Sequence, residues 1–376
     1  MIKNFLKIDI NPNRTYGLDI LRASAILFVV FGHGKSFLPS PFQKFQSFFI
    51  LDGVSLFFVL SGFLIGGILI KILEEKGANR SVLFTFWKRR WFRTLPNYFL
   101  ILSIITLYYG FNPSDFAVSN KILYFVFSQN LSYPHPTFFP EAWSLSVEEW
   151  FYILLPCSLF FLISVFKTKP KQAVLFACIS ILTLVTAFRV YRHSTTEVST
   201  LFEWAHLYRK QVITRLDSLI FGVLGAYTQY YYPKRWAKYN GLLLIISLTI
   251  FIVSQLLKVF DIIPVGSFYN CVFSFSIISL ATLLLLPYLS CFKTGTGMLY
   301  KILTFISLIS YSMYLIHLTI VKGIVLEAIP WDSISQNEGF LIVLKYSSYW
   351  AITIFISIII YKYYEKPLTS LRDKKM

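Results

Sequence analysis

Residues 240–257 read NGLLLIISLTIFIVSQLL and contain no charged side chain. An apolar run of about 18 to 20 residues is long enough to cross the ~30 Å hydrocarbon core of a bilayer as a helix. Runs of similar length and almost no charge occupy residues 268–289, 302–321 and 341–361. The sequence therefore predicts an all-α protein, a polytopic bundle of membrane-spanning helices.

The composition extends this prediction to the whole chain. Of its 376 residues, 56% are hydrophobic and 14% are charged, whereas soluble domains carry about 25% charged residues. No polar stretch is long enough to fold by itself, so we expect a single membrane domain over 1–376 and no soluble domain. No small-residue cleavage site follows the first apolar run, which favours a retained helix over a signal peptide.

The charges between the apolar blocks decide which blocks cross the membrane. Segments 71–93 and 167–171 are rich in Lys and Arg, so the positive-inside rule places both in the cytoplasm. The short block 119–132 between them then cannot cross. It contains Gln129 and Asn130, and we expect it to be re-entrant or interfacial on the outer side. About ten spans remain, with both termini cytoplasmic, near 18–37, 52–70, 92–110, 144–166, 172–190, 212–231, 240–257, 268–289, 302–326 and 341–363.

The net charge and the cysteine spacing bear on two kinds of ligand, nucleic acid and metal ions, and neither is predicted. A net charge of +17 would suggest nucleic acid in a soluble protein, but membrane proteins keep Lys and Arg in cytoplasmic loops, where anionic lipid attracts them. The loop 327–340 contains only acids as charged residues and is predicted to lie outside. The four cysteines lack metal-ligand spacing, so we predict no metal site.

Ionisable residues inside the predicted spans are the candidate functional residues, because each costs at least ~2.5–3.5 kcal/mol to insert. The first span, GLDILRASAILFVVFGHGKSF at 17–37, carries Arg22 and His33, about 16 Å apart along a helix. Gly32 and Gly34 flank the histidine, so another backbone or a ligand can approach closely. His33 is predicted near or beyond the mid-plane, either as a catalytic residue or as a histidine satisfied by a neighbouring helix.

Three other spans place charged groups at a similar depth. Glu148 and Glu149 lie near the outer end of one span and differ by about 100° around the helix, so they face different ways. Arg215 and Asp217 are expected to neutralise each other or neighbouring charges, and His317 is expected nearer the outer face. A histidine beside a carboxylate removes a hydroxyl proton efficiently, but a transporter's proton relay uses the same groups.

A second candidate site lies at the cytoplasmic side, in FWKRRWFRTLPNYF at 86–99. Arg90 and Arg93 are three positions apart and are predicted to face one direction at the start of a helix. Guanidinium groups suit phosphate oxygens, and a helix N-terminus would add a favourable dipole. A positive-inside anchor with aromatic-belt residues explains the same stretch, so both interpretations stay open.

Seven stretches in order along the chain resemble acyltransferase family 3 of membrane O-acyltransferases, which includes bacterial O-antigen acetylases and related modifiers of polysaccharides, peptidoglycan and macrolides. They run from the first predicted span to the last, and their order makes the resemblance specific although each is weak alone. The stretches are GLDILRASAILFVVFGHG, GVSLFFVLSGFLIGG, WKRRWFRTLPNYF, WSLSVEEWFYILLP, RLDSLIFG, SYSMYLIHL and YYEKPL.

The resemblance implies roles for individual residues. The family pairs a basic residue with a histidine on the first span, matched here by Arg22 and His33. It has an Arg-x-x-Arg pair that engages the phosphates of coenzyme A, matched by Arg90 and Arg93. Its recurrent glutamate in the SVE stretch corresponds to Glu148.

The chain also departs from the family pattern. Ser55 stands where members often have Asp, and Asp52 is nearby but offset, so no role is transferred to it. Trp150 replaces the usual glutamine after the two glutamates. Some members carry a fused extracellular hydrolase-like domain, and we expect none here.

The sequence thus predicts a multi-pass enzyme of the inner (plasma) membrane. It would move an acyl group, by default acetyl, from cytoplasmic acyl-CoA to a hydroxyl of a cell-envelope carbohydrate, glycolipid or similar acceptor on the outer side. His33 would act as general base or as nucleophile, Glu148 would orient or charge the site, and Arg22 would bind donor or position its helix. The alternative is a transporter or exporter, against which the lack of an apparent internal repeat weighs.

Overall fold

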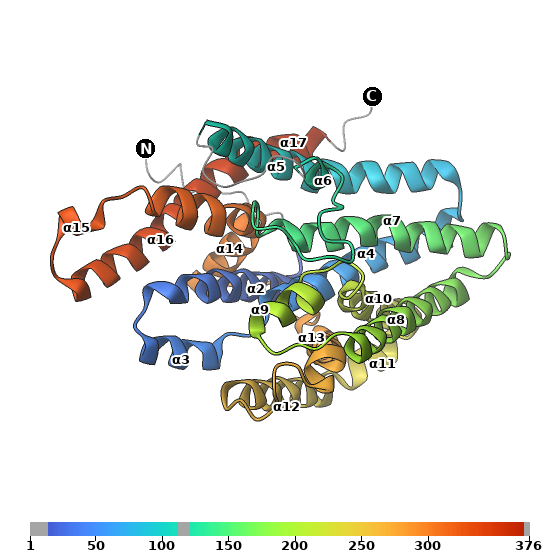
Figure 1. Cartoon of the computed structure of the whole chain (residues 1–376). Coiled ribbons are helices and arrows are strands. Elements are labelled where there is room, and N and C mark those ends of the chain that lie inside the picture. Colours follow the sequence, from blue (N-terminus) through green and yellow to red (C-terminus); the bar gives the residue numbers. More distant parts are fainter. Residues whose placement is uncertain (1–13, 112–120, 372–376) are drawn as a thin grey trace.

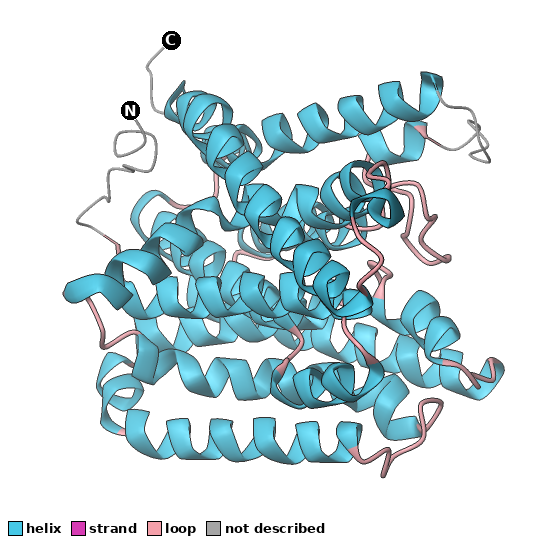
Figure 2. Ribbon diagram, turned by 90° about the vertical axis from the view of Figure 1, so that its left-hand side faces the viewer, coloured by secondary structure: helices cyan, strands magenta, loops and turns pink. Residues whose placement is uncertain are grey.

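The computed structural model describes residues 14–111 and 121–371, and in this part of the chain every regular element is a helix (Figure 2). Eight helical segments are long and apolar enough to cross a membrane, which confirms the predicted polytopic helical bundle. The main helices are α2 (Tyr16–Gly34), α3 (Ser40–Phe49), α4 (Gly53–Lys76), α5 (Arg80–Phe111), α7 (Ala142–Ser164), α8 (Pro170–Thr195), α10 (Leu216–Tyr231), α12 (Asn240–Val259), α13 (Ser274–Leu289), α14 (Gly297–Ile316) and α16 (Glu338–Ile360).

The two predicted spans outside those eight, 92–110 and 212–231, correspond to α5 and α10, although residues 212–215 precede α10. Helix α10 has 16 residues, about 24 Å by helical rise. Helix α5 is longer but begins with the basic stretch of the chain.

Connections predicted on opposite sides of the membrane lie at opposite ends of the bundle (Figure 1). Helix α3 and the short α15 (Trp331–Ile334), from two loops predicted to be outside, lie at the left. The α4–α5 and α7–α8 connections, predicted to be cytoplasmic, lie at the right. These two pairs of connections are thus separated in space, and which end is cytoplasmic stays a prediction from the charges.

Helices α4 and α10 make the most extensive helix–helix contact in the described structure. Glycines permit it: a Cβ at Gly62 would lie 1.8 Å from the carbonyl oxygen of Leu219, and one at Gly222 would lie 2.0 Å from that of Val59. Without a hydrophobic driving force between helices in lipid, such close packing contributes much of the association energy. The contact fixes α4, which carries one wall of the site described below.

The block predicted not to cross forms only a four-residue helix, α6 (Ile122–Phe125), and then irregular structure; its residues 119–120 lie outside the described part. Gln129 and Asn130 are fully buried. Their side-chain amides donate to Ser146 Oγ at 2.5 Å and to the Trp143 carbonyl at 3.0 Å. Irregular backbone at this depth is tolerated because protein surrounds it.

Candidate active site

A cavity of about 730 Å³ opens between α2, α4, α5, α7, α14 and the C-terminal helical segment, which comprises Tyr361–Glu365 and Lys366–Leu371. Its lining includes Arg22, Arg90, Arg93 and Glu148. Four of the five predicted site residues, from three separate helices, therefore share one space. The volume lies within the range of small-molecule and cofactor sites, about 300–1,000 Å³.

Glu148 faces this cavity. The groups that act on its carboxylate are the hydroxyls of Ser61 and Tyr152 and the guanidiniums of Arg93 and Arg22. Its neighbour Glu149 is buried away from the cavity and accepts a hydrogen bond from the Thr94 hydroxyl at 2.9 Å. The two glutamates face different ways, as their positions on the helix predict.

Arg22 lies on the α2 wall beside Asp19, with 4.0 Å between Nη1 and Oδ1. Asp19 is buried and also pairs with Arg14 and accepts from the Ser307 hydroxyl at 2.8 Å. The carboxylate thus ties the start of α2 to α14. Arg22 shares a counter-charge that Arg14 already engages, so positive charge remains in excess at this wall.

The structure corrects one expectation for Arg90 and Arg93. Helix α5 begins at Arg80, so both residues lie well inside it and the predicted helix N-terminus at this pair is wrong. Asn79 caps the helix instead, its Oδ1 accepting from the Val82 N–H at 3.0 Å. No Gly or Pro interrupts residues 80–90, so nothing delays the helix start. The two arginines act on the cavity through their charges and not through a helix dipole.

The last helices of the chain also line the cavity, which was not predicted from the sequence. Tyr361, Glu365 and Lys366 line the same cavity. Glu365 accepts hydrogen bonds from Asn97 Nδ2 at 2.8 Å and from Ser312 Oγ at 2.6 Å. The available sequence signal for this contribution was the YYEKPL stretch, which carries part of the resemblance but to which no role was assigned.

His33 is paired with His317: its Nδ1 lies 2.8 Å from His317 Nε2. The other ring nitrogen of His317, Nδ1, lies 2.8 Å from the carbonyl oxygen of Tyr314. A carbonyl only accepts, so His317 carries its proton on Nδ1 and its Nε2 accepts. His33 must then donate from Nδ1, which leaves a lone pair on its Nε2. These tautomers are assigned from the hydrogen-bond partners of the two rings.

The sequence suggested a carboxylate near the histidine without assigning a contact, and the structure places the His317 imidazole beside it. The close approach expected at the flanking glycines occurs at Gly34, where a Cβ would lie 2.8 Å from the Tyr349 ring, whereas the nearest atom to a Cβ at Gly32 is 3.9 Å away. Tyr349 also donates from its hydroxyl to the Val30 carbonyl at 3.2 Å. Helix α16 thereby holds the end of α2 that carries His33.

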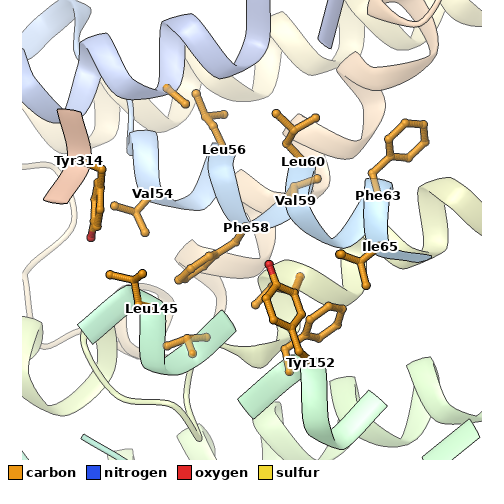
Figure 3. Close-up of a cluster of buried hydrophobic side chains, with 14 of the residues drawn as sticks. Val54, Leu56, Phe58, Val59, Leu60, Phe63, Ile65, Leu145, Tyr152 and Tyr314 are labelled. Atoms are coloured by element: carbon orange, nitrogen blue, oxygen red, sulfur yellow. The ribbon is translucent and has the colours of Figure 1, made fainter. Parts of the chain in front are cut away.

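His33 is not among the residues that line the cavity, whereas Tyr314 is. The Tyr314 ring centroid lies 5.9 Å from that of His317. The Tyr314 hydroxyl lies 2.6 Å from Ser144 Oγ and donates to the Glu141 carbonyl at 3.0 Å. Figure 3 shows Val54 of α4 facing Leu145 of α7, with Tyr314 of α14 beside them. The cavity therefore ends one side chain short of the histidine pair.

The charged residues at the start of α10 have partners on neighbouring elements. Asp217 pairs with Arg189 at 2.6 Å, and both are fully buried. Arg215 donates to Ser55 Oγ at 2.6 Å, and Ser55 in turn donates to Asp52 Oδ2 at 2.8 Å. The Ser55 hydroxyl thus bridges Arg215 to the offset carboxylate of Asp52 one turn earlier.

Comparisons with known proteins give independent evidence of the family. A family model described as an acyltransferase domain matches residues 15–362. A protein of Staphylococcus aureus (strain COL), named "Putative O-acetyltransferase", is 28% identical over 341 residues, which cover 81% of this chain and 50% of the relative. The O-acetyltransferase OatA of Staphylococcus aureus (strain NCTC 8325 / PS 47) is 30% identical over 257 residues, 59% of this chain and 40% of the relative. The chain thus spans about half the length of the first of these relatives, and no solved structure matches.

Proposed function

This chain belongs to the acyltransferase domain family, and from that premise we propose that it transfers an acetyl group from cytoplasmic acetyl-CoA to a hydroxyl on the outer side of the plasma membrane. The observation that carries the proposal is the cavity that gathers Arg22, Arg90, Arg93 and Glu148 and is lined at one end by Tyr314, whose ring centroid lies 5.9 Å from that of His317. The names of the relatives support O-acetyl transfer in particular.

The donor would enter from the end of the cavity that carries the arginines. Arg14, Arg22, Arg90, Arg93 and Lys366 all line it, and charge-assisted hydrogen bonds from such groups suit the phosphates of coenzyme A. The extended pantetheine arm would run along the apolar wall formed by Phe58 and Leu145 (Figure 3). The thioester would then reach Tyr314.

The chemistry would take place where the thioester meets His33. His33 Nε2 would accept the proton of the acceptor hydroxyl, whose oxygen attacks the thioester carbonyl. The C–S bond breaks, and the thiolate of coenzyme A leaves and is protonated. In the other route, His33 Nε2 first takes the acetyl group and then passes it to the hydroxyl. In both routes the acetyl group crosses the membrane and coenzyme A does not.

Tyr314 would turn aside in either route, because it lines the cavity and its ring lies next to that of His317. Its hydroxyl bonds to Ser144 and Glu141 at the start of α7. The acceptor hydroxyl would come from the opposite side of the membrane. The acceptor class that we propose for this O-acetyltransferase is a hydrophilic cell-envelope carbohydrate or glycolipid. This arrangement would keep water away from the thioester until the acceptor is present.

Acetyl transfer is tested with membrane vesicles supplied with radiolabelled acetyl-CoA on the arginine side. We expect label in an acceptor on the other side, and loss of labelling in His33→Ala with the protein still present in the membrane. His193→Ala, at the far end of α8, is the matched control. Substrate flux without incorporated label would instead identify a carrier.

A further inference from the structure

The acceptor side of His33 is rich in positive charge. Lys322 Nζ donates to the backbone carbonyl of His33 at 3.0 Å. Apart from the His317 ring, the strongest charges acting on the His33 ring are those of Arg209, Lys322 and Lys210. Two of these cations come from the segment between α9 (Leu201–Trp204) and α10, and the third from the π-helical continuation of α14, His317–Leu326.

The carboxylates nearby are already engaged. Glu141 accepts hydrogen bonds from the backbone N–H groups of Leu318 and Thr319 and from the Thr319 hydroxyl. Asp52 pairs with Arg209 at 3.1 Å and lies 3.9 Å from Arg215, so two guanidiniums share one carboxylate. Lys322 is offset in part by Glu327. A surplus of positive charge therefore remains around the histidine.

Among these cations, Lys210 is the clearest example of one without a counter-charge. It is half-buried, and in the described residues its ammonium has neither a hydrogen-bond partner nor a carboxylate acting on it. Burial lowers the pKa of Lys210, and the adjacent charge of Arg209 lowers it further. Its backbone is held in place, since its carbonyl accepts from Asn130 Nδ2 at 2.7 Å. A partly desolvated cation without a counter-charge costs free energy, and an anion brought by a ligand would offset that cost.

We propose that Lys210, with Lys322, binds a negatively charged group of the acceptor, a phosphate or a carboxylate, beside the hydroxyl that His33 activates. The inference rests on the proposed acetyl transfer and narrows its substrate from any hydroxyl compound to an acidic or phosphorylated glycan or glycolipid. An anion held there would also orient the hydroxyl toward His33 Nε2, because two fixed points of contact define the pose.

The same cations could instead stabilise the negative charge that develops on the thioester oxygen. That role predicts a different result. It would lower kcat for neutral and charged acceptors alike, whereas anion binding changes affinity and KM for charged acceptors only.

The test uses the full-length protein, purified and reconstituted, with three soluble probes: methyl glucoside, methyl glucuronide and glucose 6-phosphate. Binding is measured by the shift in thermal stability and turnover by transfer of labelled acetate. We expect the charged probes to bind more tightly than methyl glucoside. Lys210→Gln should raise their Kd about tenfold, the loss of one charge-assisted hydrogen bond, and leave the neutral probe unchanged. The affinities for methyl glucuronide and glucose 6-phosphate show whether a carboxylate or a phosphate is preferred.

Lys210→Arg should retain most of the affinity, and Lys44→Gln on the exposed face of α3 is the matched control for removing an outer positive charge. Equal binding of all three probes, or an equal loss of kcat for all three in Lys210→Gln, would overturn the inference. Failure of acetyl transfer to every probe by the unaltered protein would count against the proposed function instead, and the binding measurement would still decide the role of Lys210.

Discussion

The Nδ1 atom of His33 lies 2.8 Å from Nε2 of His317, although the two residues are 284 positions apart in the chain. Together with the His317–Tyr314 backbone hydrogen bond, this contact fixes which nitrogen of His33 is free. His317 therefore plays the orienting part that a carboxylate plays in many histidine-based sites. It accepts without bringing a negative charge into the membrane.

Replacing His317 by Ala should lower kcat for acetyl transfer about 100-fold, the lower end of the range for general acid–base effects, because His33 loses the acceptor that holds its tautomer. The KM for acetyl-CoA should stay the same, since the donor arginines are not altered. His317→Gln offers a side-chain carbonyl at a similar reach and should restore part of kcat. If Gln and Ala were equally impaired, a tautomer-orienting role would be excluded and a packing role favoured.

The two adjacent glutamates of α7 should differ in their importance for activity. Glu148→Gln removes a charge that Arg22 and Arg93 face across the cavity, and we expect at least about a tenfold loss of kcat/KM for acetyl-CoA, equivalent to 1.4 kcal/mol. Glu149→Gln keeps a carbonyl oxygen that can accept from the Thr94 hydroxyl, and it should retain most of the activity. Steady-state kinetics of both variants at equal membrane abundance make the comparison, and a more impaired Glu149 variant would contradict the assignment.

Two neighbouring arginines of α5 allow a similar matched comparison for the donor. Arg93 lines the cavity, whereas Arg89 is exposed and does not. Arg93→Ala should raise the KM for acetyl-CoA about tenfold, the effect of losing one charge-assisted hydrogen bond to phosphate, with a smaller change in kcat. Arg89→Ala should leave both constants close to those of the unaltered protein. A shorter donor that lacks the nucleotide, such as acetylpantetheine, should be insensitive to either substitution if Arg93 binds phosphate.

Much of this architecture could be predicted from the sequence because membrane-spanning helices are specified locally, by run length and flanking charge. The same local reasoning placed Glu148 near the outer end of its span and Arg90 and Arg93 at the cytoplasmic side, and it did not predict that the three line one cavity. It could not pair His33 with His317, because that contact depends on how α2 and α14 are rotated against each other. At His317 the helix changes to a π-helical segment, and its five-residue hydrogen-bond spacing turns later side chains to another face.

The contact between Asp52 and Ser55 was also beyond sequence reasoning. Asp52 reaches the Ser55 hydroxyl because it precedes α4 and bends back over the first turn. That position depends on Gly53, where a Cβ would lie 2.2 Å from the carbonyl oxygen of Ala25 in α2. Packing against a distant helix thus brings the Asp52 carboxylate to Ser55, the position where the resemblance leads us to expect Asp.

Close packing of α4 against α10 makes a prediction about stability that does not depend on function. In Gly222→Ala the new Cβ would lie 2.0 Å from the Val59 carbonyl oxygen and 2.5 Å from the backbone nitrogen of Phe63. Backbone atoms cannot move aside locally, so the helices must separate, and we expect a loss of about 1–3 kcal/mol, the usual cost of overpacking. Thermal unfolding in detergent, followed by helical circular dichroism, measures this as a lower Tm. Gly241→Ala is the control, because a Cβ there meets no atom within 4 Å and Ala favours a helix by up to about 1 kcal/mol over Gly. Equal Tm values for the Gly222 variant and the unaltered protein would mean that α4 and α10 do not pack as closely as this.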